Sequence, residues 1–257
     1  MQKEYPETIT LTLNTKGVLD LDTVKGCAAG MALNPRGCYG LCYAAKIAAF
    51  RGWDFSKSVN RVWGDARNRS RILDTLKRTS KKWVRIGTMG DPSMDWAHTL
   101  RVLFDLSITG KVPVVITKHW NVMTRNQVET MEYVGAVLNT SISALDTPAQ
   151  IAHRLTQFHG YRGRSILRIV SCDFNRDNEQ GAALATVQDE LFRQGGSRVI
   201  DTPLRLNGNY PLLVEGVIKA GKYKDAAGYD IGQLVSLYKK DAFLGHCRRC
   251  PDQCGVK

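Results

Sequence analysis

Residues 112–143 read V-P-V-V-I-T-K-H-W-N-V-M-T-R-N-Q-V-E-T-M-E-Y-V-G-A-V-L-N-T-S-I-S, and this stretch decides the fold. Its two ends, 112–117 and 135–143, are short runs rich in β-branched residues, which is typical of buried strands. The intervening segment 127–133 reads as a helix. Pro113 belongs at the start of its strand, because proline cannot donate to a central ladder. The stretch therefore predicts a β–α–β unit with parallel strands.

The same alternation continues on both sides of this unit. The other predicted strands are 83–87, 165–171 and 198–206, and the other predicted helices are 94–107, 148–158, 179–193 and 231–241. Thr147 is a candidate N-cap with Pro148 at the first helical position. Five or six such units predict an α/β fold, a full or partial (β/α) barrel of parallel strands. No G-x-G-x-x-G follows a strand, which argues against a Rossmann fold.

Two regions divide the chain in this interpretation. Residues 1–240 form the βα-barrel domain, because no repeat, low-complexity tract or Pro/Ser-rich linker interrupts them. Residues 241–257 form a cysteine-rich C-terminal extension. Polar side chains end several predicted strands, at the face where parallel barrels hold their active sites. They are Thr88, Gly90 and Asp91; Thr117 and Lys118; Asn139, Ser141 and Ser143; Cys172 and Asp173; and Arg205 and Asn207.

The charge is concentrated in one segment. The 257 residues include 36 Lys+Arg and 24 Asp+Glu, a formal net charge of +12, and 43% are hydrophobic, which excludes an intrinsically disordered chain. Residues 51–85 hold eleven Lys/Arg against three Asp. Apolar residues between 59 and 76 recur at helical spacing, with Arg61, Arg67, Arg69 and Arg71 expected on the outside. This basic helix is either a solvated face or a surface that contacts phosphates.

The start of the chain lacks the apolar run of a secretory signal, and no window approaches eighteen consecutive apolar residues. We therefore expect a cytoplasmic protein without a membrane partner. Thiols stay reduced in that compartment, so clustered cysteines indicate metal or redox chemistry.

Six of the seven cysteines fall into two triplets, which are Cys27, Cys38 and Cys42, and Cys247, Cys250 and Cys254. Thiolates grouped this closely are ligands for zinc or for iron–sulfur clusters. Three thiolates suit a [4Fe–4S] cluster whose fourth iron stays open, whereas structural zinc wants four ligands. For the C-terminal triplet, His246 or the isolated Cys172 could complete a zinc site or a second cluster. A zinc that bridges both ends of the chain is the third possibility for the C-terminal triplet, and incidental core cysteines are the third possibility for the N-terminal one.

The string C-Y-G-L-C-Y-A-A at 38–45 resembles the cluster loop of radical S-adenosylmethionine (SAM) enzymes. Their usual pattern is C-x₃-C-x₂-C. Here Ala45 stands at the third position, so Cys27 would supply the missing thiolate and the chain would belong to an atypical branch.

The chain also resembles a phage family, the gene-product-88 group. In that group a Cys and a C-x₃-C-Y-A motif precede a strand that ends in a Gly-Asp turn, and a cysteine cluster closes the chain. The matching features are Cys27, the string from Cys38 to Ala44, the run R-I-G-T-M-G-D at 85–91, and the C-terminal triplet.

These resemblances imply roles for particular residues. Cys27, Cys38 and Cys42 would ligate a [4Fe–4S] cluster whose open iron binds SAM. A turn of Gly87, Thr88, Met89, Gly90 and Asp91 would bind the methionine amino group, and Lys118, Ser141, Ser143 and Arg168 are candidates for its carboxylate and ribose. Lys118 and Cys172 are the candidate catalytic side chains.

The implied reaction starts with an electron donor that reduces the cluster, after which a 5′-deoxyadenosyl radical abstracts hydrogen from the substrate. The basic field favours an anionic substrate, a nucleic acid or nucleotide, by analogy with phage DNA hypermodification. A zinc-stabilised nucleic-acid-binding protein without catalysis is the main alternative. A non-radical enzyme on a βα barrel with structural cysteines is the third hypothesis.

Overall fold

The computed structural model describes residues 8–206, 217–218, 220–224, 230–239, 242–244, 247 and 250–257. Its centre is a seven-stranded sheet with the order β1-β2-β5-β6-β7-β8-β10. Every neighbouring pair from β2 to β10 is parallel, and β1 pairs with β2 antiparallel. The strands are β1 (Thr12–Leu13), β2 (Leu19–Asp20), β5 (Trp83–Ile86), β6 (Val112–Thr117), β7 (Val137–Ile142), β8 (Arg164–Ile169) and β10 (Val199–Asp201). This order is consistent with a partial β/α barrel.

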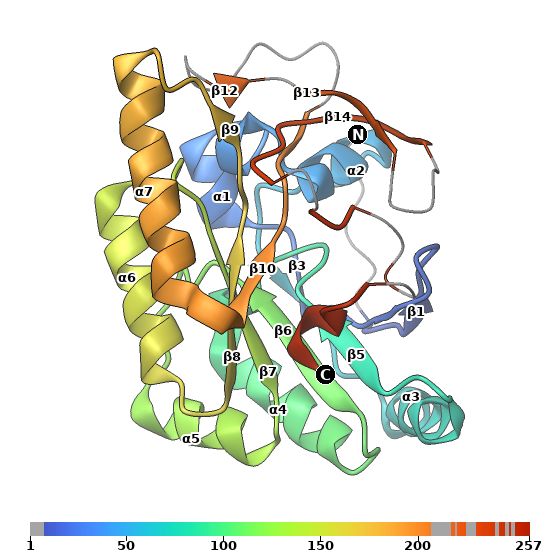
Figure 1. The fold of residues 1–257 in the computed structure, drawn as a ribbon. Coiled ribbons are helices and arrows are strands. Elements are labelled where there is room, and N and C mark those ends of the chain that lie inside the picture. Colours follow the sequence, from blue (N-terminus) through green and yellow to red (C-terminus); the bar gives the residue numbers. More distant parts are fainter. Residues whose placement is uncertain are drawn as a thin grey trace.

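Helices connect successive strands and cover one face of the sheet (Figure 1). They are α4 (Trp96–Ser107), α5 (Arg125–Tyr133), α6 (Pro148–Gly160) and α7 (Glu179–Gly195). Leu103 and Met131 from two of these helices pack against Val84, Val115 and Leu138 of the sheet, all of them buried. Alternate residues point to opposite faces of a strand, so every second residue of β5 to β8 faces away from the helices.

The other face of the sheet is partly covered by the C-terminal segment. Cys254, in the short 3-10 helix η5 (Gln253–Gly255), packs against Val114 and Val137. Ile166 and Trp83 lie in the same apolar cluster. The main sheet therefore contains the first strands of the chain, β1 and β2, and also carries the C-terminal segment.

The N-terminal region forms a separate layer beside the sheet. The short strands β3 (Val24–Lys25) and β4 (Val59–Asn60) pair antiparallel. Between them lie α1 (Ala28–Leu33), the 3-10 helix η1 (Cys38–Gly40) and α2 (Tyr43–Phe50). Helix α3 (Ala66–Arg78) follows, and its Ile72 and Leu76 are buried.

Peripheral elements complete the described part. The 3-10 helices η2 (Pro92–Asp95) and η3 (Gly196–Arg198) flank α4 and α7. The strands β9 (Asp173–Phe174) and β12 (Val217–Ile218) pair antiparallel, and β11 (Arg205–Leu206), β14 (Asp230–Val235) and β13 (Ala220–Lys224) form a three-stranded sheet. No helix among the residues seen here has the length and apolar character needed to span a bilayer.

Three sequence expectations need correction. The segment predicted as helix 231–241 begins as strand β14, since its short apolar run finds antiparallel partners in β11 and β13. The predicted strand 198–206 is split, with β10 in the main sheet and β11 in the smaller one. The basic helix begins only at Ala66, and Arg61, expected outside, is buried and donates to the Thr8 carbonyl. The predicted domain boundary at 240/241 lies outside the described residues.

Candidate functional site

The three N-terminal cysteines lie in one loop region, each beside a glycine, with Cys27 and Cys38 at Gly30 and Cys42 at Gly37. Cys27 directly precedes α1, Cys38 opens η1, and Cys42 directly precedes α2. A Cβ atom placed on Gly30 would lie 3.0 Å from the Cys27 Sγ and 3.2 Å from the Cys38 Sγ. A larger residue at this position of α1 would therefore crowd both sulfurs.

Cys42 reaches the same region from the other side of the loop. A Cβ on Gly37, which has a φ of +77°, would lie 2.4 Å from the Cys42 Cβ. Burial raises the pKa of the Cys27 thiol to about 12, and the neighbouring Asp91, Cys38 and Cys42 add to this. Burial also raises the pKa of Cys38 to about 11, although Lys118 opposes the shift. These thiols become thiolates only with a strong cationic partner, which a metal centre provides.

A single metal ion and an iron–sulfur cluster make different demands on the cysteine loop. Within the described ranges, no three His, Cys, Asp or Glu side chains close around one ion. A tetrahedral zinc needs its sulfurs at about 2.3 Å from a common centre. A [4Fe–4S] cluster binds each thiolate at a separate iron and so accepts ligands that stand farther apart. The donor set, three thiols and no histidine, also fits iron–sulfur chemistry.

The turn of residues 87–91 follows β5 and is held by a carboxylate that the sequence analysis missed. The buried Asp22 accepts hydrogen bonds from the backbone amides of Gly87 (3.0 Å), Thr88 (2.7 Å) and Met89 (3.2 Å), and from the Thr88 hydroxyl (2.7 Å). Burial alone would raise the pKa of Asp22, but Lys25 at 2.8 Å and the Thr88 hydrogen bonds hold it below its usual value. Asp22 therefore stays ionised and fixes the turn.

The same turn is joined to both ends of the cysteine loop. The Gly26 amide donates to the Met89 carbonyl (2.9 Å), one residue before Cys27. The Tyr43 hydroxyl donates to the Thr88 carbonyl, one residue after Cys42. The loop and the turn are thus neighbours, as the sequence predicted.

Asp91 ties the turn to the next strand. Its carboxylate accepts from the Ser93 amide (2.9 Å) and hydroxyl (2.7 Å), the Thr117 hydroxyl (2.6 Å) and the Lys118 amide (2.8 Å). Because Asp91 also raises the pKa of Cys27, the carboxylate faces the cysteine loop as well.

Lys118 belongs to a buried ionic network beneath Cys38. Its ammonium donates to the Tyr39 hydroxyl and lies 3.4 Å from Asp146, while Tyr39 itself donates to Asp146 at 2.7 Å. Arg154 pairs with the same carboxylate and donates to the Lys118 carbonyl at 2.8 Å. Two cations thus share the Asp146 carboxylate next to the Cys38 thiol, and Asp91, which accepts from the Lys118 amide, is a second carboxylate at the cysteine loop.

The other predicted SAM-binding residues, Ser141, Ser143 and Arg168, make their contacts away from the cysteine loop. Ser143 donates to the Val170 carbonyl (2.7 Å), so its hydroxyl has a structural partner. Arg168 pairs across strands with Ser141 and donates to the Asn139 oxygen (2.9 Å) and the Cys254 sulfur (3.3 Å). Arg168 therefore contacts the C-terminal segment.

Cys172 is fully buried in an apolar cluster with Phe174 and Leu204. This cluster differs from those that contain Cys27 and Cys42, or Cys254. Burial raises the pKa of the Cys172 thiol to about 12. A small buried core residue accounts for this environment.

Within the C-terminal triplet, Cys250 and Cys254 are neighbours. Burial raises the pKa of Cys250, while the backbone amides of Asp252 and Gln253 point at its sulfur and counteract the rise. Cys247 lies beside Trp83 at the other end of β5 from the turn. His246, a candidate fourth ligand, lies outside the described residues.

Comparison with known proteins supports the fold. No protein-family model matches the chain, and no curated protein matches its sequence. Among solved structures, it is similar to a variant of spore photoproduct lyase with bound AdoMet and dinucleoside spore photoproduct, at 13% identity and a TM-score of 0.52. The alignment covers 77% of this chain but only 60% of the lyase chain. This similarity shows that the chain shares the fold of the matched part of spore photoproduct lyase.

Proposed function

We propose that the chain is a radical SAM-type iron–sulfur enzyme that acts on an anionic substrate. One observation carries the proposal: Cys27 and Cys38 meet at Gly30, Cys42 packs in the same cluster as Cys27, and this loop lies beside the turn of residues 87–91. This is the arrangement that a SAM-binding cluster needs, with thiol ligands and a ligand-binding turn at the carboxyl end of a parallel strand. The fold similarity to spore photoproduct lyase adds support.

The cysteine loop would hold a [4Fe–4S] cluster with one iron open to SAM. When bound, the reduced cluster supplies one electron that cleaves a carbon–sulfur bond of SAM. Everything else falls to the protein, which must bind, orient and exclude water. The apolar side chains of Met31, Met89 and Trp120 pack around Cys27 and Cys42 and keep water from the loop.

The turn suits the ammonium group of SAM. Its amides donate to Asp22, so no donor of Gly87, Thr88 or Met89 points at a bound cation. Backbone carbonyls, including that of Gly90, and the Asp91 carboxylate are the acceptors available to an ammonium group. Lys118 is the candidate to bind the SAM carboxylate, because its ammonium group belongs to the ionic network next to Cys38. Ser141 and Arg168 lie farther along the inner face of the sheet, where the adenosine end would lie.

The test is anaerobic purification, followed by iron, sulfide and zinc analysis and incubation with SAM and a reductant. We expect iron and sulfide in the ratio of a [4Fe–4S] cluster, and 5′-deoxyadenosine as a product. Cys38→Ala and Cys42→Ala should lose both. Cys172→Ala is the matched control and should keep both, because the Cys172 cluster contains none of the three loop cysteines and meets the loop only through Tyr39 and Leu41 among the described residues. Stoichiometric zinc without iron would favour a zinc-stabilised binding protein instead.

A further inference from the structure

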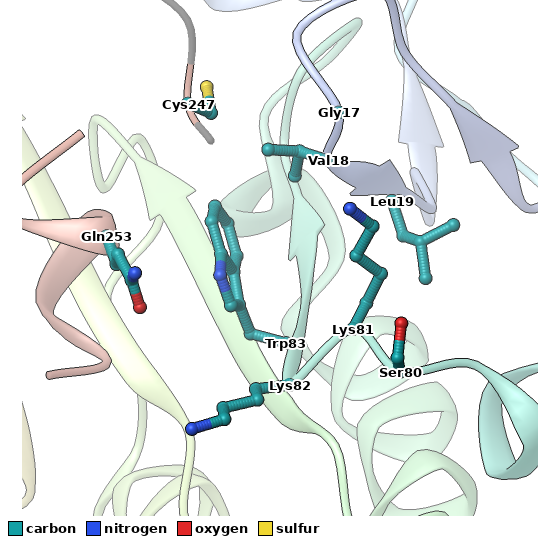
Figure 2. A pocket seen from close by; sticks show the side chains of 9 residues that line it. All are labelled: Gly17, Val18, Leu19, Ser80, Lys81, Lys82, Trp83, Cys247 and Gln253. Atoms are coloured by element: carbon teal, nitrogen blue, oxygen red, sulfur yellow. The ribbon is translucent and has the colours of Figure 1, made fainter. Parts of the chain in front are cut away.

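A second candidate site lies at the other end of β5 from the turn of residues 87–91. The pocket is formed by residues 17–19 between β1 and β2, residues 80–83 between α3 and β5, and Cys247 and Gln253 of the C-terminal segment (Figure 2). Its volume is about 270 Å³. Because β5 has four residues, the pocket lies about 13 Å along the strand from the turn.

The charge in this pocket is positive. Lys81 and Lys82 line it, Ser80 adds a hydroxyl, and none of its nine lining residues is acidic. Lys16 borders it at the 17–19 turn, and its pKa is lowered by burial and by the nearby Arg205 and Arg85.

Asp20 follows the pocket residue Leu19 in β2, but its carboxylate is already engaged. Arg85 binds it at 2.9 and 3.1 Å, and the Asn14 amide binds it at 2.8 Å. No described residue that lines the pocket supplies an anion for these cations, which favours an anionic ligand.

The pocket also contains an aromatic wall. Figure 2 shows the Trp83 indole standing between the Lys81 side chain and Gln253. Trp83 is half-buried, and its other side packs in the apolar cluster of Val112 and Val114. A tryptophan supported from behind by a sheet is a rigid surface on which a nucleobase can stack.

A basic helix leads directly into the pocket. Helix α3 ends at Arg78, two residues before Ser80, and carries Lys77 and Arg78 in its last turn. Arg67 and Arg71 are exposed farther along the same helix. The cations thus continue from the pocket over several residues, which suits the repeated phosphates of a polymer better than a single small anion.

We infer that this pocket and α3 form a binding site for single-stranded nucleic acid, with one base stacked on Trp83 and the flanking phosphates on Lys81, Lys82 and the end of α3. The pocket volume lies just below the range of about 300–1,000 Å³ for small-molecule sites, so the pocket suits one nucleotide of a longer strand. A duplex would keep its bases stacked internally and could not present one to the indole. The inference deepens the proposed function by naming the substrate class, and it rests on that function only for the statement that the bound polymer is the substrate.

The experiment measures the binding of a fluorescent single-stranded oligonucleotide to the full-length protein by anisotropy, as a function of salt. We expect Lys81→Ala/Lys82→Ala to weaken binding and to lower the salt slope by about 1.4, because each phosphate contact on a single strand contributes about 0.7. The control is Arg125→Ala/Arg193→Ala, which removes the same charge from exposed positions on α5 and α7. This control should leave the slope unchanged within error.

Trp83→Leu tests stacking and keeps an apolar side chain against Val112 and Val114. We expect binding to weaken roughly 5- to 150-fold, the range found when a stacking aromatic is removed. Circular dichroism of each variant verifies that it is folded. An abasic oligonucleotide should bind the native protein as weakly as the normal oligonucleotide binds Trp83→Leu.

Three outcomes would overturn the inference. The first is an equal loss of binding in the control pair, which would show that only overall charge matters. The second is an abasic or duplex probe that binds as tightly as the normal strand. The third is a pocket variant that binds like the native protein while polyglutamate competes fully, which would assign the charge to an acidic protein partner.

A separate measurement tests the proposed function, so that its failure can be distinguished from failure of the binding site. The same preparations are assayed for iron and for 5′-deoxyadenosine formed in the absence of oligonucleotide. Loss of binding in Lys81→Ala/Lys82→Ala with unchanged SAM cleavage supports both proposals. A protein that lacks a cluster but binds the oligonucleotide through Trp83 would remove the proposed function and leave the binding site intact.

Discussion

At the residue scale, Asp146 is the single carboxylate that two buried cations share. Lys118 and Arg154 both contact it, and Tyr39 donates a hydrogen bond to it. Breaking a buried ion pair from one side leaves an uncompensated charge, which costs far more than losing an exposed pair. We therefore expect Asp146→Asn to lower the free energy of unfolding by about 3–5 kcal/mol in urea denaturation.

The matched control for this change is Glu129→Gln. Glu129 pairs with Arg125 at 2.9 Å on α5, and both side chains are exposed. Its loss should cost less than about 1 kcal/mol. Equal effects of the two substitutions would show that the network below Cys38 is not a stabilising unit.

His119 gives a pH dependence that can be assigned to one residue. Burial, with His153 and Arg154 nearby, lowers the pKa of His119 to about 3 in the folded protein. The unfolded chain binds a proton near pH 6.5, whereas the folded chain stays neutral there. Its contribution to stability is therefore complete above pH 6.5 and is lost as the pH falls toward 3, at about 1.4 kcal/mol per pH unit.

The measurement compares urea unfolding of the native protein and His119→Asn between pH 7 and pH 4. Asparagine tolerates the positive φ of 51° at this position but has no titrating group. We expect the unfolding free energy of the variant to fall less steeply with decreasing pH. The slopes should differ by about 1.4 kcal/mol per pH unit, which corresponds to one proton. Identical slopes would mean that another group causes the acid sensitivity.

At the scale of the elements, a substitution at Gly30 of α1 tests the cysteine loop without replacing any of its cysteines. Alanine is the better helix former, so Gly30→Ala should not weaken α1 by propensity. Its Cβ would nevertheless lie 3.0 and 3.2 Å from two sulfurs, tighter than ordinary contact. We expect a folded protein with an unchanged melting temperature within a few degrees and a clearly reduced iron content after reconstitution.

Gly160→Ala is the control for this prediction. Gly160 ends α6, and a Cβ there would meet no atom within 4 Å. It should bind as much iron as the native protein. Full iron loading of Gly30→Ala would show that the sulfurs stand farther from the helix than the geometry requires.

The elements also show where sequence reasoning succeeds. The β–α–β pattern of 112–143 and the N-cap at Thr147 depend on near neighbours in the chain, and both are confirmed. The cysteine loop and the turn of residues 87–91 meet through a long-range contact between Gly26 and Met89, and their shared role as a SAM site stays a prediction. By contrast, 230–235 is a strand, since the pairing with β11 and β13 outweighs a helix-like apolar spacing.

The residues that the sequence analysis missed act over long separations. Asp22 reaches the turn of residues 87–89 from 65 residues away, and Tyr39 meets Asp146 from 107 residues away. The alternation L-D-L-D at 19–22 does carry a strand signal, which could have placed β2 beside the sheet. Nothing in that signal says which amides the second aspartate accepts, because that depends on the parallel pairing of β2 with β5.

At the scale of the whole molecule, the C-terminal segment packs against the central strands β6, β7 and β8. The Cys254 carbonyl accepts from Asn139 (3.0 Å), the Val256 carbonyl accepts from Arg164 (2.8 Å), and Cys254 covers Val114 and Val137. Most of these contacts belong to the backbone or to apolar packing. They therefore do not depend on a thiolate or on a metal.

This distribution leads to a prediction that separates packing from metal binding. A chain that ends at residue 249 should lose about 2–4 kcal/mol in urea denaturation, from the burial that Cys254 and Val256 provide, and should bind more of the dye ANS. Cys254→Ala keeps the backbone contacts and should cost about 1 kcal/mol or less. If the C-terminal cysteines instead held a structural metal, Cys254→Ala and a chelator would each destabilise the protein as much as the truncation does, because metal-binding free energy is then folding free energy.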